Sequence, residues 1–77
     1  MDRNSLKNEL QNTLQSKLPE LRNELGLSQE GFAELIGKSR QSVSLFERGE
    51  LKLSWETCLA IFAVTINRDK NVLANIY

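Results

Sequence analysis

The side chains in this chain that could do chemistry are hydrogen-bonding groups rather than catalytic groups. Arg40 carries a guanidinium fork that can pair with O6 and N7 of guanine, and the amide of Gln41 can pair with N6 and N7 of adenine. Ser44 offers an adaptable hydroxyl, and Leu45 can meet the methyl group of thymine. All four would contact DNA bases only if the element that carries them entered the major groove of a duplex.

Catalytic chemistry is not expected from the composition. The chain has no His, so the commonest general base and zinc ligand is missing. Its single cysteine, Cys58, can form neither an internal disulfide nor a thiolate metal site. The sequence has no phosphate loop and no paired carboxylates at a plausible cleft. We therefore expect no enzymatic activity, no metal and no cofactor.

Size and charge narrow the remaining functions. A chain of 77 residues forms one domain, and its small core leaves no room for a large cofactor pocket. Ten Lys and Arg residues balance ten Asp and Glu residues. This balance excludes attraction to nucleic acid by bulk positive charge but permits a local basic face. Because no apolar run is long enough for a membrane span or a secretory signal, we expect a cytoplasmic protein without membrane contact.

Apolar residues recur at helical spacing along nearly the whole chain, which predicts an all-α fold. Leu6, Leu10 and Leu14 form a stripe on a helical extension that covers residues 1–17. Capping residues and glycines divide the chain into helices. The predicted helices cover about 4–16, 16–25, 28–37, 39–48, 55–66 and 69–77.

The third and fourth predicted helices have the spacing of two short helices joined by a tight turn. Ala33 is small enough for the next helix to cross over it. Gly37 can adopt the left-handed backbone conformation that the turn requires. The inward faces of the two helices are expected to close a small core from Leu35, Ile36, Val43 and Phe46.

The segment from Leu25 to Gly49 carries a Leu-Gly-Leu-Ser-Gln run, an Ala-x-x-x-Gly turn and a closing Glu-Arg-Gly. In these motifs the chain resembles the phage Cro/repressor-like helix-turn-helix family, also called the XRE family, over residues 18–66. The resemblance implies a five-helix, lambda-repressor-like DNA-binding domain that is usually dimeric and regulates transcription. In this single domain, residues 1–17 would add an N-terminal helix and residues 67–77 a C-terminal one.

The resemblance also implies roles for individual residues. The helix over 39–48 would enter the major groove of double-stranded DNA with its N-terminal half, which carries the candidate base contacts. Gln29 would bind a phosphate at the start of the preceding helix. Side chains that flank the recognition helix would contact other phosphates: Lys38, Ser42, Arg48 and Lys52. Glu47 would pair with Arg22 and tie the recognition helix to the preceding core helix.

Two departures from the family pattern stand out. Gly31 lies inside a predicted helix, at a cost of about 1 kcal/mol relative to Ala, and close packing against the N-terminal extension would account for it. Glu50 and Leu51 replace Lys or polar residues, which weakens the positive phosphate clamp. Other apolar residues suit either the core or a dimer surface: Leu51, Leu53, Trp55, Val72, Leu73, Ile76 and Tyr77.

Two interpretations of function stay open. In the first, a homodimer regulates transcription by placing two recognition helices in successive major grooves of a near-palindromic site. In the second, the helix-turn-helix is a scaffold for protein–protein interaction, antitoxin-like or an adapter, and binds DNA weakly. Zero net charge favours the scaffold, as does the leucine stripe of Leu6, Leu10 and Leu14. That stripe can pack on its own domain, form a dimer or bind a protein partner.

Overall fold

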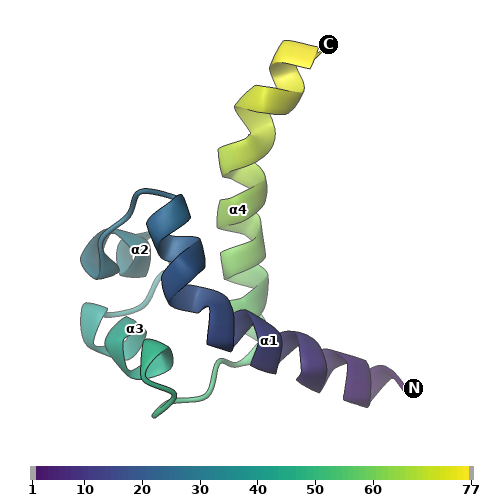
Figure 1. Cartoon of the computed structure of the whole chain (residues 1–77), viewed down its shortest axis with the longest axis vertical. Coiled ribbons are helices and arrows are strands. Elements are labelled where there is room, and N and C mark those ends of the chain that lie inside the picture. The colour runs from purple at the N-terminus through teal and green to yellow at the C-terminus, as the bar shows by residue number, and fades with distance from the viewer. Residues whose placement is uncertain (1, 77) are drawn as a thin grey trace.

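The computed structural model describes the backbone of residues 2–76 and the side chains of residues 2–67. The described residues form helices and no strand, which confirms the all-α prediction. The four helices are α1 (Arg3–Glu24), α2 (Gln29–Ile36), α3 (Arg40–Glu47) and α4 (Trp55–Ile76). The N-terminal part of α1 and the C-terminal part of α4 extend from the body in different directions (Figure 1). None of the described helices is both long enough and apolar enough to span a membrane.

The predicted division of the N-terminal region into two helices is wrong, because α1 continues through it. The helix begins after Asp2, whose carboxylate accepts a hydrogen bond from the backbone N–H of Ser5 at 2.7 Å. Ser16, expected to start a second helix, instead donates its hydroxyl to the carbonyl of Thr13 at 2.9 Å. Residues 3–17 are therefore part of α1 and not a helix of their own.

Pro19 lies inside α1 rather than in a first helical turn. A proline within a helix leaves the carbonyl four residues earlier, here that of Gln15, without its helical partner. The helix nevertheless continues, because neighbouring residues of α1 are held in place by contacts with the rest of the domain. Leu18 is fully buried in the core, and the side chain of Gln15 bonds to the chain beyond α3. Tertiary contacts thus outweigh the local cost of the proline.

The predicted break near Ile66 is also wrong. The backbone of α4 is helical from Trp55 to Ile76, and the chain has no glycine or proline after Gly49 that would end it. The described residues thus form four helices, and a five-helix domain with an extra N-terminal helix is not confirmed. Some residues left open between core and dimer surface lie outside the described side chains: Val72, Leu73, Ile76 and Tyr77.

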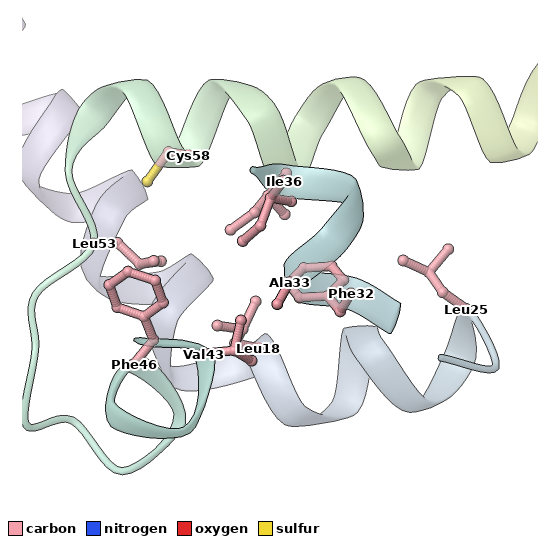
Figure 2. Close-up of a cluster of buried hydrophobic side chains, with 10 residues drawn as sticks. Leu18, Leu25, Phe32, Ala33, Ile36, Val43, Phe46, Leu53 and Cys58 are labelled. Atoms are coloured by element: carbon pink, nitrogen blue, oxygen red, sulfur yellow. The ribbon is translucent and has the colours of Figure 1, made fainter. Parts of the chain in front are cut away.

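The core lies where α2 packs against α3 and α4, and α1 packs against the same two helices (Figure 2). Its buried members are Leu18, Leu25, Phe32, Ala33, Ile36, Val43, Phe46, Leu53, Cys58 and Ile61. Leu35 was expected among them but is 57% exposed, because it lies about 100° around α2 from Ile36 and misses the buried face. Of the ambiguous residues, Leu53 is in the core, Trp55 is half-buried against it, and Leu51 is exposed.

The connection between α2 and α3 has the predicted turn chemistry. Gly37 ends α2 in the left-handed conformation, with φ of 70°, and the N–H of Lys38 bonds to the carbonyl of Ala33 at 2.9 Å. Ser39 caps α3, because its hydroxyl accepts a hydrogen bond from the N–H of Ser42 at 3.0 Å. The turn and the cap together set the direction in which α3 leaves α2.

Gly31 does not pack against the N-terminal part of α1, so that explanation is wrong. A Cβ atom at this position would lie 3.3 Å from Oγ of Ser28 and 3.8 Å from Cδ2 of Leu27. The same Oγ of Ser28 accepts a hydrogen bond from the N–H of Gly31 at 3.0 Å. The glycine therefore leaves room for the serine that caps α2.

Candidate nucleic-acid interface

The exposed face of α3 begins at its first turn, where Arg40 and Gln41 are both exposed. Val43 and Phe46 are buried, at 0% and 4% exposure. At 100° per residue, Gln41 lies nearly opposite this buried pair. The core therefore fixes the helix so that its first turn presents a guanidinium and an amide to solvent.

The other two candidates for base contacts are less accessible. Ser44 and Leu45 are half-buried. Their carbonyls close the C-terminal end of α3: that of Ser44 accepts the N–H of Arg48 at 3.1 Å, and that of Leu45 accepts the N–H of Glu50 at 2.9 Å. Their side chains still belong to the outward half of the helix, beside Gln41.

The candidate phosphate contacts fall into two groups. Lys38 and Lys52 are exposed, and neither forms an ion pair among the described side chains. Arg48 is also exposed, but its Nε lies 2.8 Å from Oε2 of Glu50. The hydroxyl of Ser42 accepts a hydrogen bond from the cap of α3 at 3.0 Å. Lys38 therefore lies just before α3 and Lys52 lies beyond its end, with the partly compensated Arg48 between α3 and Lys52.

Glu47, the last residue of α3, is the centre of a polar network. Nε of Arg22 lies 2.6 Å from its Oε2, and Nη2 lies 3.2 Å from its Oε1. Nη1 of Arg22 donates to the carbonyl of Leu27 at 2.9 Å. Gln29 donates its amide to Oε1 of Glu47 at 3.1 Å. The network joins α1, the start of α2 and the end of α3.

The network shifts the titration of both charged groups. Burial by itself raises the pKa of Glu47, but the hydrogen bonds from Arg22 and Gln29 and the charge of Arg22 outweigh it, so the pKa lies below its usual value. The hydrogen bond to Glu47 raises the pKa of Arg22 against the smaller opposing effect of burial. Both groups therefore stay ionised at neutral pH.

The position of Gln29 bears on its expected phosphate contact. Gln29 is the first residue of α2 and is half-buried, and its amide nitrogen already donates to Glu47. A phosphate at this end of α2 would therefore meet the free backbone N–H groups of the first turn before it met the side-chain nitrogen. The side chain of Gln29 thus has a structural contact within the protein, which its place at the start of α2 did not indicate.

Two glutamines of α1 hold the chain just beyond α3, and sequence reasoning missed both. Nε2 of Gln15 donates to the carbonyls of Phe46, at 3.0 Å, and Leu51, at 2.8 Å. Oε1 of Gln15 accepts the N–H of Leu53 at 3.1 Å. Nε2 of Gln11 donates to the carbonyl of Leu53 at 3.0 Å.

The signal for these glutamines was their spacing. Gln11, Gln15, Leu18 and Arg22 occur at helical intervals of four, three and four residues, so they share one face of α1. The face that contacts α3 and the following loop is mostly polar.

The leucine stripe does not act as one unit. Leu14 packs against the core, whereas Leu6 and Leu10 are 51% and 42% exposed. Leu10 and Leu14 line a groove of about 360 Å³ between α1 and α4, with Phe62 on the α4 side. The first part of α1 thus presents apolar surface beyond the core.

A family model described as helix-turn-helix matches residues 19–65, more than half of the chain. The matched residues run from the second half of α1 into α4 and include both members of the Arg22–Glu47 pair. No curated protein and no solved structure matches the chain.

Proposed function

Because the chain belongs to the XRE-type helix-turn-helix family, we propose that it is a sequence-specific DNA-binding regulator of transcription that places α3 in the major groove. The observation that carries this proposal is the first turn of α3. Arg40 and Gln41 are exposed there, on a helix whose other face is anchored in the core by Val43 and Phe46. A rigid helix with readable donors at its N-terminal half is what direct readout of bases needs.

The proposed roles follow the exposure of each side chain. Arg40 and Gln41 contact base edges. The half-buried Ser44 and Leu45 add base contacts further toward the C-terminal end of α3. Phosphates are held by residues around the helix: Gln29, Lys38, Ser42, Arg48 and Lys52. These contacts position the domain and carry no sequence information of their own.

We propose that the regulator is a homodimer. Helix-turn-helix dimers bind half-sites about 34 Å apart, one turn of DNA. Among the described residues, those that line the groove of about 360 Å³ belong to α1 and α4 and include Leu10, Leu14 and Phe62. A second copy seated at this groove would leave α3 of both copies free for DNA. The mass of the protein in solution, measured by light scattering, tests this part of the proposal.

Selection of bound sites from random duplex DNA tests the function as a whole. We expect an enriched site made of two related half-sites whose centres are about one helical turn apart. Enrichment of a single half-site would support DNA reading by a monomer and contradict the dimer. A selection that enriches nothing would contradict sequence-specific binding and favour a protein-interaction scaffold.

A further inference from the structure

We propose that Gln15, supported by Gln11, is a positioning residue that holds Lys52 in place for contact with the DNA backbone. The inference rests on the proposed function. It adds to that function a residue that contacts neither bases nor phosphates but positions one of the phosphate contacts. The two glutamines precede the matched range 19–65, whereas Lys52 lies within it.

The chain between α3 and α4 has little support of its own. The N–H groups of Gly49 and Glu50 bond back to the carbonyls of Phe46 and Leu45, at 3.1 and 2.9 Å. Beyond Leu51, the next backbone–backbone hydrogen bond in the described chain joins Cys58 to Ser54. Residues 52–54, which precede α4, are neither helical nor paired with a strand.

The amide of Gln15 supplies the missing support on both sides of Lys52. It donates to the carbonyl of Leu51 at 2.8 Å and accepts the N–H of Leu53 at 3.1 Å. Gln11 bonds the carbonyl of Leu53 at 3.0 Å, so both backbone polar groups of Leu53 are satisfied by α1. The side chain of Leu53 is fully buried, whereas Lys52 is exposed.

The same amide ties this loop to the recognition helix. Nε2 of Gln15 also donates to the carbonyl of Phe46 in the last turn of α3, at 3.0 Å. One side chain thus fixes the position of Lys52 relative to α3. Because the loop is ordered before DNA arrives, the ordering entropy is not lost on binding. A side chain that holds a binding residue in this way changes affinity without touching the ligand.

Gln15→Ala tests the contact, with Asn12→Ala as the matched control. Asn12 lies on the same part of α1 and lines the same polar groove of about 500 Å³ as Gln15 and Lys52, but it is exposed and bonds to neither Leu51 nor Leu53. Hydrogen exchange of the Leu53 amide is the direct readout. We expect faster exchange in Gln15→Ala and unchanged exchange in Asn12→Ala. Unchanged exchange in both variants would overturn the proposal.

A double-mutant cycle on DNA binding separates positioning from a general structural role. Lys52→Ala is measured in the parent and in Gln15→Ala, on non-specific duplex at low salt, where phosphate contacts dominate. In the parent it should make the salt slope shallower by about 0.9 per subunit. In the Gln15→Ala background, Lys52→Ala should change the affinity by less than about twofold. The loss caused by Gln41→Ala on the selected site should be the same in both backgrounds.

Each outcome of this cycle decides one question. If the losses of affinity from Gln15→Ala and Lys52→Ala are additive, Gln15 only stabilises the fold. The same conclusion follows if Gln15→Ala weakens the contacts of Gln41 and Lys52 equally. A parent that binds no duplex at all would overturn the proposed function, and this inference with it. If Gln15→Ala does not fold, Gln11→Ala removes only the bond to the Leu53 carbonyl and enters the same cycle with the same criteria.

Discussion

The carboxylate of Glu47 at the end of α3 lies 2.6 Å from Nε of Arg22 on α1. The two side chains are only 9% and 15% exposed, and Arg22 forms a second bond to the same carboxylate. Because Arg22 also holds the carbonyl of Leu27, its guanidinium joins three parts of the chain. A two-point arginine–carboxylate contact fixes direction as well as distance. The pair therefore sets how the recognition helix is attached to α1.

We expect Arg22 and Glu47 to be energetically coupled. Removal of one partner leaves the other charge partly buried without compensation, so Arg22→Ala and Glu47→Ala should each destabilise the fold. The double variant should lose less than the sum, with a coupling of at least about 0.5 kcal/mol. Urea unfolding of the four proteins gives the coupling directly. Strictly additive losses would mean that the contact contributes nothing to stability.

The same pair predicts how stability depends on pH. The pKa of Glu47 is lowered in the folded protein, so folding favours its ionised form. This contribution is fully present above the unfolded pKa of about 4.3 and is lost as pH falls through the folded pKa. Denaturant midpoints of the parent and of Glu47→Gln should therefore converge as pH is lowered below about 4. The other carboxylates titrate in both proteins, so the difference between the two curves reports on Glu47 alone. A difference that stays constant over that range would contradict the prediction.

The parts of the fold that were predictable depend on local signals. Ser28 and Ser39 cap their helices, and Gly37 makes the turn between them, because each acts through neighbours within a few residues. The contact between Arg22 and Glu47 came from the family resemblance, which carries three-dimensional information that spacing alone lacks. It is present in the structure.

The parts that were missed depend on contacts between distant residues. A possible cap at Ser16 and a proline at position 19 both favour a helix start, yet α1 continues because the rest of the domain holds it. Gln11 and Leu53 are 42 positions apart, and no local pattern connects them. The engagement of Gln29 by Glu47 likewise depends on how α2 and α3 pack. At the proposed site, the sequence indicated which side chains can contact DNA, but it did not indicate that Ser44 and Leu45 are half-buried.

We expect Ala33→Leu to destabilise the domain severely. Ala33 is 2% exposed in the core between packed helices, and overpacking of such a site costs roughly 1–3 kcal/mol. A domain of this size has about 3–5 kcal/mol from its core. The same change at the exposed Ala63 of α4 is the control and should leave the melting temperature nearly unchanged. A melting temperature of Ala33→Leu within a degree or two of the parent would show that α3 does not pack over this position.

We expect Glu50→Gln to strengthen non-specific DNA binding. The change frees Arg48 from its 2.8 Å ion pair and removes a negative charge beside a proposed phosphate contact. Both side chains are more than half exposed, so stability should change little. Glu9→Gln makes the same charge change at an exposed position of α1 outside that groove and is the control. Equal gains from the two variants would show that only net charge matters.

The last prediction separates base reading from phosphate binding by comparing Gln41 with Lys52. Both side chains are exposed, so alanine at either position should leave the melting temperature unchanged. If Gln41 reads a base, Gln41→Ala should weaken binding to the selected site by about 1–3 kcal/mol and leave non-specific binding intact. If Lys52 meets a phosphate, Lys52→Ala should weaken both and make the salt slope shallower by about one unit per subunit. Because the chain has no net charge, this contrast does not depend on a strong background attraction to DNA. Two variants that lose specific and non-specific affinity alike would contradict the assignment of Gln41 to base contact.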